Sequence, residues 1–154
     1  MIAVLVVVAA VLLQLILVNR LPLPGGGMPD LVLLAVVGVA MTRGPAMGAA
    51  IGFCSGLLVD VVPPTAHVAG EYAFVLTVVG FLAGRGMGGV VPTVVACVLA
   101  APLLAAVVGA LVGEQGVTPA ALAVKAPVTV VYTLVVAPVV IWAVTRGKQP
   151  RYAV

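Results

Sequence analysis

The sequence predicts an all-α fold: a polytopic integral membrane protein of about six transmembrane helices, packed as one domain over residues 1–154. Hydrophobic residues make up 64% of the chain and charged residues only 7%, whereas charged residues make up about 25% of an average soluble domain. The apolar residues also gather in runs close to the roughly 20 residues that a helix needs to cross a bilayer. We therefore expect lipid around most of the surface.

The first apolar run, Met1–Val18, is predicted to be a helix of the mature protein. It lacks the basic leader and the small-residue cleavage site of a signal peptide. The segment Asn19–Asp30 (NRLPLPGGGMPD) follows. Its three prolines and three consecutive glycines predict a loop.

The second run, Leu31–Met41, is short for a membrane span. Even counted from Pro29 it reaches only about 20 Å, at about 1.5 Å per residue. It either crosses the membrane, which gives six spans, or lies in the interface, which gives five. We favour six, because the interfacial placement leaves 11 to 13 apolar residues on the surface and puts Asp30 and Arg43 on one face.

Four longer runs are predicted to cross the membrane, at residues 45–62, about 68–84, about 94–112 and 119–145. The last run begins with Thr118 and Pro119, a helix cap followed by proline in the first helical position. Pro127 and Pro138 lie inside it, so we expect tilt or a kink in this helix.

The charged residues indicate how the chain is oriented. With six spans and a cytoplasmic N-terminus, five of the seven basic residues fall inside: Arg43, Arg85, Arg146, Lys148 and Arg151. The outside then holds Arg20 and Lys125 together with the acidic residues Asp30, Asp60, Glu71 and Glu114. The positive-inside rule favours this distribution. We therefore expect a multi-pass inner-membrane protein with a short basic cytoplasmic tail, residues 146–154. With five spans the N-terminus lies outside and Arg20 also falls inside, so the charge count by itself slightly favours five spans.

A stripe of small residues marks the third run. Glycine recurs at every fourth position, and an aspartate takes the next place in the series: Gly44, Gly48, Gly52, Gly56 and Asp60. Such a stripe lets a second helix approach backbone to backbone, which is a main source of helix association in lipid. Two interpretations stay open, namely packing within this chain and a docking groove for a partner helix.

Asp60 is the most unusual ionisable residue, because a charge within a span is costly and normally faces protein or water. From Gly44 it lies about 24 Å along the helix, near the outer edge. Lys125 enters its own span from the same side at similar depth, so an Asp60 to Lys125 ion pair is predicted. The alternative is that Asp60 caps a helix or reaches the interface.

No catalytic, cofactor-binding or metal-binding residues are expected, and the protein is predicted not to be an enzyme. Its basic residues are spread singly and form no patch for nucleic acid. Cys54 and Cys97 lie in separate apolar runs without metal-ligand spacing. His67 is the only histidine and lies beside prolines in a predicted outer loop, away from any nucleophile.

Four sequence elements follow one another in a fixed order. They are PDLVLL at residues 29–34, GFCSGLLVD at 52–60, Gly70 followed by Tyr72 and Ala73, and GFLAGR at 80–85. Together they resemble the rod shape-determining protein MreD family of bacteria, and the likeness covers most of the chain. The chain departs from the family in the Pro-rich loop before Asp30, in its basic C-terminal tail and in low aromatic content, with Phe81 where tyrosine is commoner.

The resemblance implies a non-enzymatic membrane subunit of the complex that elongates the peptidoglycan cell wall and sets cell shape. Such a subunit acts as a scaffold that binds a bitopic MreC-like protein and, less directly, a RodA-type synthase and an MreB-type filament. MreD-like chains are also similar in span arrangement to the S components of energy-coupling-factor transporters. The alternative function is therefore a small-molecule-binding component of such a transporter, which needs a pocket with several convergent polar groups.

Overall fold

The computed structural model describes residues 2–16, 26–61, 70–113 and 119–146, and over these residues it holds helices and no strands. The six helices are α1 (Ile2–Ile16), α2 (Leu31–Arg43), α3 (Pro45–Val61), α4 (Glu71–Arg85), α5 (Val90–Val112) and α6 (Pro119–Thr145). The all-α prediction is confirmed. Two stretches are long and apolar enough to cross a membrane, α5 and residues 125–145 of α6. Five residues with predicted placements, Arg20, His67, Glu114, Lys148 and Arg151, lie outside the described residues.

Local chemistry explains where the helices begin and end. α2 begins at Leu31 because the Asp30 carboxylate accepts the Leu33 backbone N–H at 2.8 Å, which caps the helix. α5 begins four residues before its predicted start, at Val90. Pro92 lies in the first turn of this helix, where proline is tolerated because its missing N–H would have no partner.

The short helix α2 lies at the centre of the bundle. Every residue from Leu31 to Met41 is buried, and α2 contacts each of the other five helices. A helix lying in the membrane interface would keep one exposed face. α2 keeps no such face over residues 31–41, and enclosure within the bundle explains its short, continuously apolar sequence.

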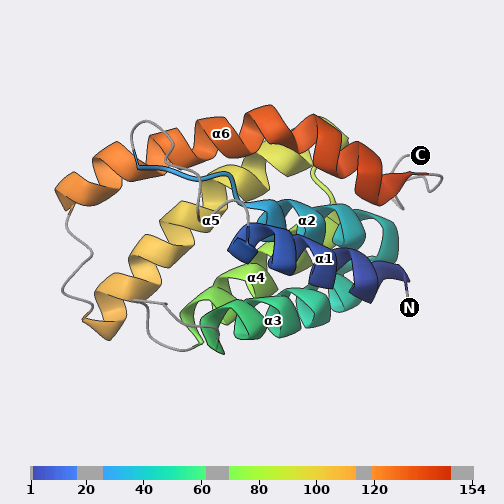
Figure 1. The fold of residues 1–154 in the computed structure, drawn as a ribbon, viewed down its shortest axis with the longest axis horizontal. Coiled ribbons are helices and arrows are strands. Elements are labelled where there is room, and N and C mark those ends of the chain that lie inside the picture. Colours follow the sequence, from blue (N-terminus) through green and yellow to red (C-terminus); the bar gives the residue numbers. More distant parts are fainter. Residues whose placement is uncertain (1, 17–25, 62–69, 114–118, 147–154) are drawn as a thin grey trace.

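Consecutive helices run in opposite directions (Figure 1). Gly84, near the end of α4, lies against Pro45, where α3 starts, while the start of α2 meets the start of α4 through Asp30 and Tyr72. One end of the bundle, the basic end, thus carries Arg43, Arg85 and Arg146. The opposite, acidic end carries Asp30, Asp60 and Glu71, together with Lys125 near the start of α6.

The two longest helices reach beyond the block formed by the other four. At about 1.5 Å per residue, the 23 residues of α5 span about 34 Å and the 27 residues of α6 about 40 Å. Figure 1 shows α5 and α6 diverging toward the acidic end, so that they flank the start of α2. This divergence positions the cavity described below.

Candidate functional site

The glycine stripe of α3 packs directly against α4. A Cβ atom on Gly52 would overlap the backbone carbonyl of Leu76, and one on Gly56 would overlap the Cα of Ala73. Gly48 is equally close to the carbonyl of Gly80. The stripe is therefore covered by a helix of this chain and presents no open groove, which favours the interpretation as internal packing.

α4 carries its own glycines at the same contact. A Cβ on Gly80 would overlap the Gly48 carbonyl, and one on Gly84 would meet the backbone of Gly44 and Pro45. Gly44 differs from the other glycines of the stripe, because it lies at the C-cap of α2. Its φ of 94° is a conformation that favours glycine. The two helices thus approach as closely as their backbones allow.

Asp60 caps α4 from the neighbouring helix. Its side chain is 7% exposed, and Oδ2 accepts the backbone N–H groups of Gly70 and Ala73, each at 3.0 Å. Gly70 occupies the N-cap position of α4 but has no side chain with which to satisfy these amides. A carboxylate placed there also lies at the positive end of the helix dipole. Asp60 therefore locks the end of the α3–α4 pair that the glycine stripe brings together.

The predicted ion pair between Asp60 and Lys125 is not among the contacts that the structure shows for Lys125. That side chain is exposed on α6, and α6 makes at most marginal contact with α3. The backbone amides of Gly70 and Ala73, at the start of α4, are among the partners of the Asp60 carboxylate. This arrangement matches the capping alternative.

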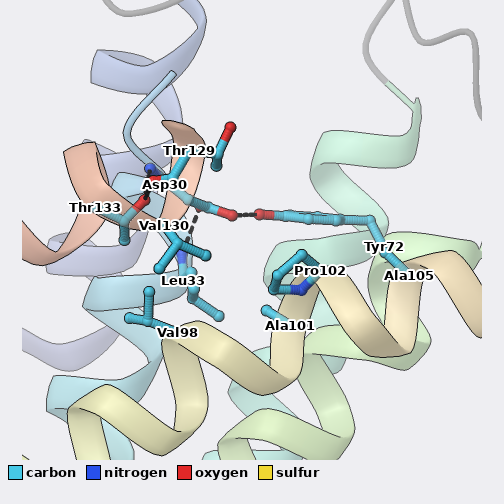
Figure 2. A pocket seen from close by; sticks show the side chains of 10 residues that line it. All are labelled: Asp30, Leu33, Tyr72, Val98, Ala101, Pro102, Ala105, Thr129, Val130 and Thr133. Carbon is cyan, nitrogen blue, oxygen red and sulfur yellow. Dashed lines mark hydrogen bonds between the residues drawn. The ribbon is translucent and has the colours of Figure 1, made fainter. Parts of the chain in front are cut away.

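A second polar cluster lies at the start of α2 (Figure 2), and it joins four helices. The hydroxyl of Tyr72, on α4, donates a hydrogen bond to the Asp30 carboxylate. The backbone N–H of Asp30 donates to Thr133 on α6 at 3.1 Å, and Thr133 in turn donates to the Thr129 carbonyl at 2.7 Å. On the α1 side, Gln14 accepts from the Leu31 N–H at 2.9 Å.

Burial raises the pKa of the Asp30 carboxyl above its ordinary value, and hydrogen bonds from Leu33, Tyr72 and Val32 act in the opposite direction. The carboxylate is thus both desolvated and held in place. It fixes the start of the central helix to its neighbours.

A cavity of about 170 Å³ opens beside this cluster, between α2, α4, α5 and α6. Its polar side chains are Asp30, Tyr72, Thr129 and Thr133. Its apolar wall consists of Leu33, Val98, Ala101, Pro102, Ala105 and Val130. Figure 2 shows Tyr72 reaching across the cavity to Asp30, with Pro102 and Ala101 beneath the ring. The cavity combines a largely apolar body with one acidic, hydroxyl-lined side.

The sequence predicts a loop that ends at Asp30, and it marks Tyr72 only through the motif of Gly70, Tyr72 and Ala73. The Pro29-Asp30 pair ahead of an apolar run is a recognisable helix-start signal. Nothing in the sequence pairs Thr133 with Asp30, which lies 103 residues earlier.

Thr133→Val is expected to destabilise the protein by about 1–3 kcal/mol, because the Asp30 N–H loses its acceptor inside the bundle. Thr145→Val is the matched control, since Thr145 makes the same 2.7 Å bond to the carbonyl four residues earlier. Thermal unfolding of both purified variants measures the difference. Equal melting temperatures for the two would show that the Asp30 contact contributes nothing.

Among the described residues, no group of three or more His, Cys, Asp or Glu side chains lies close enough to hold a metal ion. The stripe and the Asp60 cap hold helices of this chain together, whereas the space beside Asp30 is unfilled by the described side chains. No protein-family model, no curated protein and no solved structure matches this chain.

Proposed function

We propose that the chain crosses the bacterial inner membrane six times, with the basic end in the cytoplasm and the acidic end outside. The alternating helix directions support six crossings, and the enclosure of α2 removes the objection that this run is too short to face lipid. Holding Arg43, Arg85 and Arg146 in the cytoplasm satisfies the positive-inside rule.

Within this membrane body, the proposed function is that of a non-enzymatic, MreD-like subunit of the cell-wall elongation complex. It binds a bitopic MreC-like protein and acts as a scaffold near a RodA-type synthase and an MreB-type filament. The main support comes from the GFCSGLLVD motif at residues 52–60, which carries part of the resemblance to the MreD family. Its glycines and Asp60 hold α3 to α4. This rigid pair offers a surface for other proteins.

The outer faces of this pair suit such a role. Phe53 and Leu57 on α3, and Phe74 and Phe81 on α4, are exposed on the surface of the chain. In a membrane these side chains contact lipid or another transmembrane helix.

Affinity purification of the tagged chain from gently solubilised native membranes tests the proposal. The expected result is co-purification of a single-span protein with a coiled-coil extracytoplasmic part, together with loss of rod shape when the chain is depleted. Recovery of ATPase subunits instead would favour the transporter alternative. Normal cell shape after depletion, with no co-purifying membrane protein, would contradict the proposed function.

The transporter alternative rests on a different observation, the Asp30 cavity. A small-molecule-binding component needs convergent polar groups in a mostly apolar pocket, and Asp30, Tyr72 and Thr129 meet in such a place. Co-purification of an ATPase pair would be its distinguishing result.

A further inference from the structure

The Asp30 cavity has the size of one small apolar group. Its volume of about 170 Å³ is close to the roughly 150 Å³ of an engineered apolar protein cavity that binds benzene. Val98, Ala101, Pro102 and Ala105 form an apolar wall from α5. Pro102 also has no N–H to donate to the Val98 carbonyl, so this turn of α5 lacks one helical hydrogen bond.

The polar side of the cavity is rich in acceptors. An ionised carboxylate has about four acceptor sites, and Asp30 receives the Leu33 and Val32 N–H groups and the Tyr72 hydroxyl. Tyr72 donates in that bond, and within the described chain its own oxygen accepts no hydrogen bond. Thr133 already both donates and accepts.

Asp30 is the only charged side chain among the described residues that line the cavity. Among the described residues that line it there is no Lys, Arg or His, so within that lining Asp30 brings a negative charge with no cation beside it. A half-buried carboxylate beside an apolar cavity gains from a cationic partner that also donates hydrogen bonds.

We propose that this cavity is a binding site for a protonated amine carried on an apolar body about the size of a benzene ring. The ammonium group donates to Asp30 and to the Tyr72 oxygen, while the apolar body packs against α5 beneath the Tyr72 ring. This site does not require the partner proposed above, because the amine contacts the side chains of Asp30 and Tyr72, whereas the glycine stripe packs on the backbone of α4.

Benzylamine is the probe, with benzoate and benzyl alcohol as ligands of similar size but different charge. Purified protein in phosphatidylglycerol nanodiscs is heated with each compound. Benzylamine at about ten times its dissociation constant should raise the melting temperature by about 3–6 °C. Benzyl alcohol should give a smaller rise and benzoate none. Equal shifts with benzoate and benzylamine would overturn the proposal.

Two variants locate the binding. Asp30→Asn keeps an acceptor for the helix cap but removes the charge, so at least a tenfold loss of benzylamine affinity is expected. Ala105→Phe adds a ring to the apolar wall of the cavity while every polar side chain stays unchanged, and it should abolish the shift. Val107→Phe, on an exposed position of the same helix, is the control and should keep it. Unchanged benzylamine affinity in both folded site variants would place binding elsewhere and refute the site.

The natural amine has two possible sources, a soluble molecule and the ethanolamine headgroup of a phospholipid. Repeating the titration in nanodiscs that contain phosphatidylethanolamine separates them. A weaker apparent affinity for benzylamine there identifies the headgroup as a competitor. An unchanged affinity identifies a soluble amine.

Discussion

Gly52→Leu is expected to unfold or strongly destabilise the bundle. A Cβ at this position already overlaps the backbone carbonyl of Leu76, and a backbone group inside a helix cannot move aside as a side-chain tip can. Ordinary overpacking costs about 1–3 kcal/mol, and we expect this substitution to reach or exceed the upper end. Thermal unfolding of the purified variant in detergent measures the loss.

The matched control is Ala50→Leu, two residues away on an exposed part of α3. It adds a side chain of the same size but meets no backbone of α4, so a melting temperature close to that of the unsubstituted protein is expected. Gly52→Ala should fall between the two. Normal yield and stability of Gly52→Leu would show that α3 and α4 do not pack as the structure places them.

Asp60→Ala should have the second largest effect. Removing a helix cap costs about 0.5–2 kcal/mol, and hydrogen bonds to a charged group contribute about 1.5–3 kcal/mol. Because a single oxygen, Oδ2, accepts both the Gly70 and the Ala73 N–H, the amide oxygen of Asp60→Asn can take its place. We therefore expect Asp60→Asn to keep most of the stability.

Lys125 distinguishes the cap from an ion pair. If Asp60 acts as a cap, the free energies of unfolding for Asp60→Ala and Lys125→Ala add in the double variant, within about 0.3–0.5 kcal/mol. If the two residues form an ion pair, Asp60→Ala alone should be more harmful than the double variant, because it leaves the ammonium without its counter-charge. A double variant more stable than Asp60→Ala would support the ion pair and contradict the cap.

The helices could be predicted from the sequence because each is a run of apolar residues bounded by glycine, proline or charge. The predicted and observed bounds of the third helix, 45–62 against Pro45–Val61, differ by one residue, and those of the sixth are identical. The glycine stripe was visible for a similar reason, since its residues share one helical face. Local periodicity carries this information without any knowledge of the neighbours.

Contacts between distant segments could not be predicted from the sequence. The central position of α2 depends on being enclosed by five other helices, whereas its sequence shows only that it is short and apolar. Two partners of Asp60 are backbone amides, which every residue but proline possesses, so no sequence pattern marks them. The Asp30 cavity requires Tyr72 and Thr133 to meet from α4 and α6, and their spacing along the chain gives no sign of it.

The most direct test of the membrane account uses single cysteines at opposite ends of the bundle. In a Cys54→Ala, Cys97→Ala background, Met87→Cys reports the turn after α4 and Val112→Cys reports the end of α5, both at exposed positions. A membrane-impermeant maleimide applied to intact cells should label position 112, and should label position 87 only after lysis. Labelling of position 87 in intact cells would contradict the proposed orientation.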